Sequence, residues 1–208
     1  MALAFADIAF TPSVRAVQEA QGSAQAYGKF LRPEAEGGNR LSEREAAFIS
    51  RRDGFYQSTV SETGWPYVQF RGGPSGFLKV IDDKTIAYAD FRGNRQYLSV
   101  GNLAANDRVS LILMDYPNRQ RLKIWGRVKL VDATEAPELI AELHDETYRA
   151  RPERAVVITI EAFDWNCPQH IPRRFTLDEF EEKFESLREE ITQLRAENER
   201  LKSAATPA

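Results

Sequence analysis

The sequence has one cysteine, Cys167, and two histidines among its 208 residues. A single cysteine excludes an intramolecular disulfide and a cysteine-based zinc cluster, and it favours a reducing compartment such as the cytoplasm. Basic charge is not in excess, because Lys and Arg number 28 against 31 Asp and Glu, so no basic field for nucleic acid is expected. No apolar run reaches the roughly 18 residues of a membrane span. We therefore expect neither nucleic acid nor a membrane as partner, and no metal site.

The composition divides the chain into three parts around a single core. Hydrophobic residues make up 42% of the chain, which is enough for one well-buried domain. The composition changes at residues 34–39, where the run EAEGGN is typical of a flexible segment, and again after His170. We therefore expect an arm at residues 1–40, a β domain at residues 41–170, and a C-terminal helix and tail at residues 171–208.

Two short helices are predicted from their end signals. Thr11 suits the N-cap of a helix over Pro12–Ala20, because proline is favoured at the first helical position. In a second helix, over Leu41–Arg52, Ser42 and Glu45 form a capping box. The apolar side of this second helix is expected to consist of Ala46, Ala47 and Ile49.

The middle of the chain has the pattern of an antiparallel β domain, because short apolar segments alternate with turn signals. Helices are predicted between strands at residues 94–106, with Leu98 and Leu103 facing the core, and at residues 136–146, where Pro137 begins the helix. The predicted class is mainly β with flanking helices, as a small barrel. Its strands are expected at residues 55–60, 67–70, 77–81, 85–91, 108–116, 121–132 and 155–165.

A heptad pattern occupies the C-terminal part. Isoleucine at a with leucine at d favours a parallel two-stranded coiled coil, and a buried Asn198 pairs best with its own copy. We therefore predict a homodimer; the alternative is a single amphipathic helix that lies on its own barrel. The a positions are Leu177, Phe184, Ile191 and Asn198, and the d positions are Phe180, Leu187, Leu194 and Leu201.

Two turns carry cations beside flexible backbone. The first, QFRGGPSGFLK, places Arg71 and Lys79 around three glycines, and its N–H groups suit a phosphate. An ordinary hairpin loop with surface cations is the alternative. The second, ADFRGNRQY, places Arg92 and Arg95 at a predicted helix N-terminus, whose dipole also favours anions. Together the two turns predict a site for a small phosphorylated ligand.

The order of these segments resembles the FMN-binding split barrels related to pyridoxamine 5'-phosphate oxidase. The resemblance rests on YVQF and FLKV, on YADF followed by GNRQYLSVGNLAANDRV, on LILMDY, and on RLKIWGRVKLVD. It covers residues 41–132 and the surroundings of Trp165. It implies an antiparallel split β-barrel, FMN as the cofactor, and a homodimer with the flavin site between the subunits.

The same resemblance implies the roles of individual residues. Gln69 and Lys79 match the positions that hold the FMN phosphate, with Arg71 sharing the task. The phosphate-binding turn corresponds to Asn94, Arg95 and Gln96. Other positions that the resemblance places near the flavin are Tyr88 and Ala89 on a strand, Arg121 across the dimer interface, and Trp165 with Asn166.

A third group of candidate functional residues lies in DWNCPQHIPRRF, where a strand is followed by an irregular turn. Cys167 and His170 are candidate catalytic residues, because a thiol or an imidazole beside a flavin relays a proton or shapes the pocket. The alternatives are a buried small hydrophobe and a helix-entry residue. In this region the sequence departs from the vitamin B6 oxidase, whose substrate-clamping arginine and histidine have no counterpart here.

The resemblance favours an FMN-dependent oxidoreductase that acts on an unknown small molecule. A non-catalytic flavin carrier or redox-sensing module, whose coiled coil engages another protein, is the second hypothesis. Heme or deazaflavin binding on the same barrel is the third, and a heme would need His144 or His170 as its axial ligand.

Overall fold

The computed structural model describes residues 3–32, 34–165 and 167–205. Its contacts divide the chain into two units. The first, here called the sheet unit, comprises Met1–Asp115 and Gln120–Gln169. The second, the helix unit, comprises Tyr116–Arg119 and His170–Ala208. Among the described residues, none of the helices combines the length and apolar character that crossing a bilayer requires.

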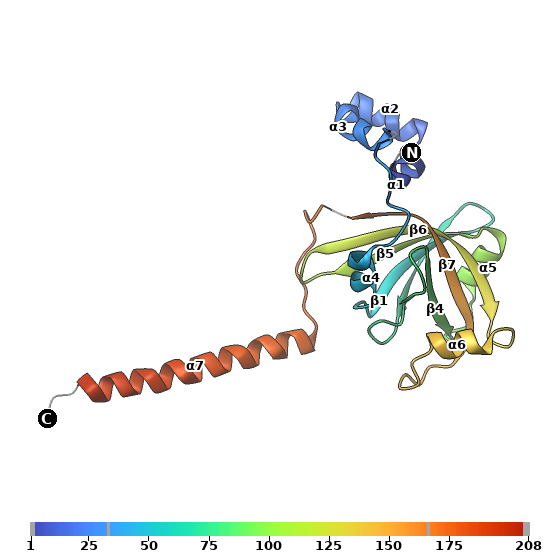
Figure 1. The fold of residues 1–208 in the computed structure, drawn as a ribbon. Coiled ribbons are helices and arrows are strands. Elements are labelled where there is room, and N and C mark those ends of the chain that lie inside the picture. The colour runs from blue at the N-terminus through green and yellow to red at the C-terminus, as the bar shows by residue number, and fades with distance from the viewer. Residues whose placement is uncertain (1–2, 33, 166, 206–208) are drawn as a thin grey trace. The chain divides into compact units, whose positions relative to one another are not determined.

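One antiparallel sheet forms the centre of the sheet unit (Figure 1). In space the strands follow the order β2-β1-β5-β6-β7-β4-β3, so β2 and β3 are the two edges and are not hydrogen-bonded to each other. The mainly β class with flanking helices is therefore confirmed, whereas the described sheet does not close into a barrel. The strands are β1 Gly54–Val60, β2 Pro66–Gly72, β3 Lys79–Val80, β4 Thr85–Phe91, β5 Arg108–Asp115, β6 Gln120–Asp132 and β7 Pro152–Trp165.

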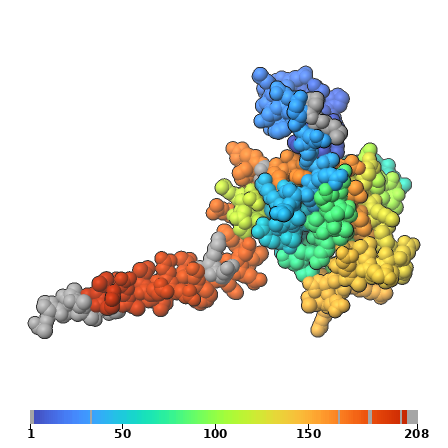
Figure 2. Space-filling view, in the orientation of Figure 1, coloured from blue at the N-terminus to red at the C-terminus, as the bar shows by residue number. Residues whose placement is uncertain are grey.

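The core lies on the inner face of this sheet, where alternate residues of β1 and β5 are buried. Phe55 stacks on Phe77 at 5.5 Å and meets Tyr88 edge-on at 5.3 Å, measured between ring centroids. Strand β4 is buried on both faces, because Ala87 and Ala89 pack in a second cluster with Leu143 of helix α6 (Pro137–Leu143). Figure 2 shows the strands and the helices α4 to α6 packed as one continuous body.

Helix α4 (Glu43–Ile49) forms the predicted capping box. Ser42 Oγ accepts a hydrogen bond from the Arg44 amide at 3.2 Å, and the Ser42 amide donates to Glu45 Oε2 at 3.0 Å. The Trp165 indole donates to Glu45 Oε1 at 2.7 Å. Burial acts to raise the pKa of Glu45, but the hydrogen bonds from Ser42 and Trp165 outweigh it, so the pKa is lowered.

The apolar side of α4 differs from the prediction. Glu45, Phe48 and Ile49 are buried, whereas Ala47 is exposed. Phe48 meets the Trp165 ring edge-on at 4.8 Å between centroids, so the helix packs through its larger side chains. A carboxylate is tolerated on the buried side because its oxygens are fully engaged in hydrogen bonds.

The N-terminal arm contains short helices, and the predicted one is confirmed. In α2 (Pro12–Ala20) the Thr11 hydroxyl accepts from the Val14 amide at 3.4 Å. The arm joins the sheet where the Phe163 amide donates to the Gly38 carbonyl at 2.7 Å, and where Phe5 contacts Trp125 at 5.1 Å between ring centroids. The other elements of the arm are α1 Ala4–Ala9, α3 Ala24–Gly28 and the 3-10 helix η1 Lys29–Leu31.

Helix α5 (Leu98–Ala105) is shorter than predicted at its N-terminal end. Arg95 and Tyr97 have left-handed backbones, with φ of 62° and 53°, which an α-helix does not accommodate. The helix therefore begins at Leu98 rather than at Asn94. Leu103 is buried as predicted, but Leu98 is 46% exposed and does not face the core.

Helix α7 (Leu177–Ala205) is the long C-terminal helix that the heptads predict. Thr176 and Glu179 cap its start, because the Thr176 amide donates to Glu179 Oε2 at 2.9 Å. The helix is confirmed, and its pairing as a coiled coil stays a prediction. Exposed fractions along its apolar stripe run from 44% to 78%, over Leu177, Phe180, Phe184, Leu187, Ile191, Leu194 and Leu201.

Candidate functional site

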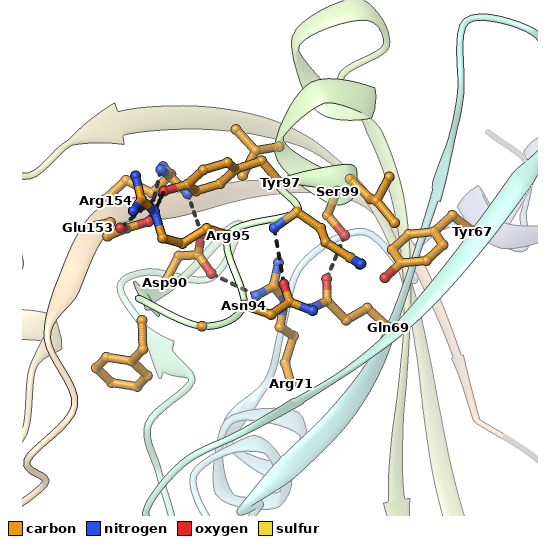
Figure 3. Close-up of a pocket in the computed structure, with 15 residues that line it drawn as sticks. Tyr67, Gln69, Arg71, Asp90, Asn94, Arg95, Tyr97, Ser99, Glu153 and Arg154 are labelled. Carbon is orange, nitrogen blue, oxygen red and sulfur yellow. Dashed lines mark hydrogen bonds and ion pairs between the residues drawn. The ribbon is translucent and has the colours of Figure 1, made fainter.

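A polar cleft of about 220 Å³ opens where β2 faces the end of β4 (Figure 3). Strand β2 contributes its inward-facing residues, and the loop at residues 92–97 and the first turn of α5 contribute most of the rest. The start of β7 completes the wall. The polar side chains that line it are Tyr67, Gln69, Arg71, Asp90, Asn94, Arg95, Gln96, Tyr97, Ser99, Glu153 and Arg154.

Asp90 lies at the floor of the cleft between two arginines. Arg71 Nη1 lies 2.7 Å from Asp90 Oδ1, and Arg154 Nη1 lies 2.7 Å from Asp90 Oδ2. The Asp90 side chain is only 5% exposed. A buried carboxylate requires such pairing, because an isolated buried charge is strongly unfavourable. Asp90 therefore fixes both guanidinium groups in place.

Glu153 is the second carboxylate of the cleft, and it is shared among several donors. The Tyr97 hydroxyl donates to Glu153 Oε1 at 3.3 Å, and Arg154 Nη2 lies 3.4 Å from Oε2. Arg92 Nε lies 3.8 Å from Oε1. The charge of Glu153 is thus balanced within the wall.

Arg95 is the cation of the cleft that is not committed to a carboxylate. Its Nε donates to the Tyr97 hydroxyl at 3.4 Å. Within the part of the chain that the structure describes, Arg95 forms no ion pair. Three arginines and two carboxylates line the cleft, so one positive charge is in excess, and Arg95 supplies it at the exposed rim.

The N-terminus of α5 opens on the same cleft. Leu98, Ser99 and Val100 line it, and no side chain caps this first turn. The first backbone N–H groups of a helix have no intrahelical acceptor, and the helix dipole adds positive potential there. Ser99 Oγ donates to Gln69 Oε1 at 2.9 Å, which joins α5 to β2.

This donor set fits a phosphate group. Arginine forks and uncapped helical N–H groups are the donors that proteins use for phosphate. The volume is below the roughly 300–1,000 Å³ of pockets that enclose a drug-sized ligand. The cleft therefore suits a phosphate and its adjoining atoms, with the rest of a larger ligand outside it.

The structure brings together both cationic turns that the sequence singled out. Gln69 and Arg71 come from the first turn, and Asn94, Arg95 and Gln96 come from the second. Asn94 Oδ1 accepts from the Gln96 amide at 3.1 Å, which tightens the second turn. Whether these residues bind a phosphate stays a prediction.

Lys79, Tyr88 and Ala89 lie elsewhere. Lys79 pairs with Ala87 in the sheet and lines a separate hollow with Ser50 and Gly76. The pKa of Asp145 is lowered mainly by hydrogen bonds from Thr147, with a smaller effect of the Lys79 charge. The Lys79 charge is therefore close enough to act on Asp145. Lys79 does not line the cleft to which Arg95 belongs.

Tyr88 and Ala89 do not present side chains to the cleft, because β4 is buried on both faces. Tyr88 is 1% exposed and Ala89 is 2% exposed. The Tyr88 hydroxyl donates to Gln57 Oε1 at 2.6 Å, and burial raises the pKa of Tyr88 strongly. The side chains of both residues therefore belong to the core and do not line this cleft, and their position beside a flavin stays a prediction.

The remaining predicted residues also lie outside the cleft. Arg121 is on the outer face of β6 with Lys123 and Trp125. Trp165 packs on α4, where the Arg44 guanidinium lies 4.4 Å from its ring centroid. Asn166 falls outside the described residues. The candidate catalytic residues, Cys167 and His170, are both exposed, and neither lines the cleft.

Sequence reasoning missed several residues of the cleft. Asp90 had a usable signal, because a carboxylate in the apolar run TIAYADF predicts a buried charge that needs a cationic partner. Its partner Arg154 had none, since it is far away in the chain. Glu153 was missed for the same reason, whereas Tyr97 and Ser99 lie at and just after the end of the predicted turn and lacked only the positive charge that singled out its arginines.

The family model described as pyridoxamine 5'-phosphate oxidase matches residues 41–166, more than half of the chain. The chain belongs to the pyridoxamine 5'-phosphate oxidase family. The resemblance drawn from the sequence is thereby confirmed. All cleft residues of this family member lie within the matched segment. A comparison with curated proteins gave no match.

Among solved structures, HupZ from group A Streptococcus aligns with a TM-score of 0.50 at 15% identity, over 65% of this chain and 99% of its own. An FMN-binding protein from Syntrophomonas wolfei aligns with a TM-score of 0.45 at 17% identity, over 72% and 97%. An F420 reductase aligns with a TM-score of 0.43 at 21% identity, over 60% and 98%. At these identities the likeness to HupZ supports a shared fold, and nothing further follows from these alignments.

Proposed function

We propose that this member of the pyridoxamine 5'-phosphate oxidase family binds FMN and acts as an FMN-dependent oxidoreductase on a small molecule. The observation that carries the proposal is Arg95, an arginine that forms no ion pair among the described residues, beside the uncapped N-terminus of α5. A phosphate monoester matches both features, because it carries the charge and the acceptor oxygens that they lack.

In this proposal the cleft holds the phosphate end of FMN. Arg95 and the first N–H groups of α5 bind the phosphate oxygens, and Arg71 presents its Nε, which is buried and has no hydrogen-bond partner in the described part of the chain. Gln69 and Ser99 hold β2 against α5 beside the ligand. Bound FMN supplies hydride or electron transfer, and the protein orients it and excludes water.

The homodimer is part of the same proposal, and an apolar patch on the outer face of β1 and β2 supports it. Tyr56 and Phe70 are cross-strand neighbours, with ring centroids 5.5 Å apart, and are 41% and 59% exposed. Val68 next to them is 60% exposed. Contiguous exposed apolar surface of this kind marks interaction sites. Arg121 of the partner subunit would then complete the flavin site, and the single cysteine of each chain keeps the cytoplasm as the proposed location.

Pairing of α7 as a parallel coiled coil is the second part of the dimer proposal. Replacing Leu187 and Leu194 together by alanine should raise the dimer dissociation constant by about tenfold or more, because both d-position side chains lose their partners. The change Glu189→Ala, at an outward position of the same helix, is the control and should have no effect. Sedimentation velocity over a dilution series measures both. An unchanged constant for the leucine variant would show that the stripe does not pair the subunits.

A non-catalytic flavin carrier or redox-sensing module is the second candidate, and the exposed apolar stripe of α7 favours it. The same stripe that pairs two copies would then present a docking helix to another protein. Heme binding is less favoured, because neither His144 nor His170 is among the residues that line the cleft.

The absorbance spectrum of the purified protein tests the proposal. We expect flavin bands, or their quenching and shift when FMN is added to the protein. Anaerobic addition of NADH or NADPH should then bleach the bands, and air should restore them. Retained flavin without reduction by either nucleotide would favour the carrier. A Soret band, or no interaction with FMN at all, would contradict the flavin proposal.

A further inference from the structure

We propose that Asp90 is a positioning residue of the phosphate site: its carboxylate holds Arg71 and Arg154 together on the floor of the cleft and joins edge strand β2 to β4 and β7. The inference rests on the proposed function, because it assigns a role within the same site. It concerns a residue that is negatively charged in a site for an anion, where a carboxylate alone would weaken binding.

The hydrogen bonds of the sheet do not hold β2 in place from this side. In the described sheet β2 pairs with β1 alone, and its other edge is open. Arg71 extends from β2 across this opening, and Asp90 near the end of β4 receives it at 2.7 Å. Arg154, near the start of β7, reaches the second oxygen of the same carboxylate at 2.7 Å. One carboxylate thus connects three strands that are not all neighbours in the sheet.

The carboxylate and both guanidinium groups are largely buried, so they must remain paired with one another. The Asp90 side chain is 5% exposed, and the side chains of Arg71 and Arg154 are each 16% exposed. In Figure 3 the two guanidinium groups approach Asp90 from different sides. With both Asp90 oxygens occupied, the Arg71 Nε remains buried without a partner among the described residues. Arg71 is therefore fixed by one of its nitrogens and has another left for a ligand.

The two possible roles of Asp90 predict opposite changes in phosphate affinity for the same substitution. If the carboxylate only offsets positive charge, Asp90→Asn removes one negative charge from the cleft and strengthens phosphate binding. If it positions the arginines, the same change frees two buried guanidinium groups and the edge of β2, and binding weakens. The direction of the change in affinity therefore decides between the two roles.

The experiment compares the affinities of the wild-type protein and three variants by calorimetric titration with FMN and by competition with inorganic phosphate. Asp90→Asn should weaken both ligands by about tenfold or more, the effect of losing well-placed hydrogen bonds to a charged group. Asp90→Glu, which keeps the charge but displaces it, should give an intermediate affinity. Asp107→Asn is the charge-matched control, because Asp107 pairs with Arg127 at the surface and does not line the cleft. This variant should bind FMN and inorganic phosphate with the affinity of the wild-type protein.

A second measurement separates positioning from loss of the fold. Hydrogen exchange of the β2 amides at Gln69 and Arg71 should accelerate in Asp90→Asn, while the amides of β6 stay protected. Should Asp90→Asn not fold, Asp90→Glu carries the test. Binding by the variant as tight as the wild type or tighter, with unchanged exchange, would overturn the role of Asp90 alone. Failure of the wild-type protein to bind either ligand would overturn the proposed function and this inference together.

Discussion

Replacement of Arg95 by alanine is expected to weaken FMN binding roughly tenfold, the effect of losing one charge-assisted hydrogen bond to the phosphate. Replacing Arg71 as well should bring the loss to roughly a hundredfold, because the two arginines contact different sides of one group. Asp90 remains paired with Arg154 in the double variant, so the fold is expected to survive. Fluorescence quenching of FMN on titration with protein measures the affinity.

The loop itself supplies the matched control. Arg92 lies three positions before Arg95 in the same loop, but it is associated with Glu153 and does not line the cleft. Arg92→Ala removes the same charge and should leave the affinity within about twofold, because exposed charges act weakly at a distance. Equal losses for Arg92→Ala and Arg95→Ala would mean that general charge rather than the cleft attracts FMN.

Lys79 distinguishes the sequence-based phosphate site from the structural one. The resemblance pairs Lys79 with Arg95, whereas the structure places Lys79 in a separate hollow beside Ser50 and Gly76. Lys79→Ala should therefore retain wild-type affinity for FMN. A loss as large as that of Arg95→Ala would show that Lys79 reaches the phosphate after all and that the cleft is not the whole site.

Replacement of Phe55 by alanine is expected to cost about 3–5 kcal/mol of unfolding free energy, the usual range for a buried phenylalanine. Phe55 is 1% exposed and contacts the rings of both Phe77 and Tyr88. The cavity left behind would remove the contacts of Phe55 with both rings and leave only the direct edge-on contact of Phe77 with Tyr88, whose centroids are 6.4 Å apart. Since domains have only about 5–15 kcal/mol in total, the variant should be close to unfolding.

Urea denaturation followed by circular dichroism measures this effect. Phe55→Leu, which keeps most of the volume, should cost only about 1 kcal/mol. Val17→Ala in α2 is the exposed control, because Val17 is 61% exposed and should change stability by less than about 0.5 kcal/mol. Similar losses for Phe55→Ala and Val17→Ala would contradict the assignment of the core to this aromatic cluster.

The sequence by itself determined the features that depend on neighbours in the chain. The capping box at Ser42 and Glu45, the proline-led helix α2 and the seven strands all follow from local signals, and the structure contains them. Local signals suffice there because caps and side-chain periodicity act over a few residues. The heptads of α7 likewise predict a long helix. The family resemblance was readable for the same reason, since it rested on the order of such segments.

Only the tertiary structure decided which charges meet. Asp90 and Arg154 are distant in the chain, and antiparallel pairing of β4 with β7 brings them together. The pairing of β3 with β4 places Lys79 beside Ala87, away from the cleft that Arg71 and Arg95 share. The side of a strand on which a residue points depends on register, and register is set by contacts between strands rather than within them. The two cationic turns could therefore be found in the sequence, but the arginines that pair with the Asp90 carboxylate could be assigned only in the folded chain.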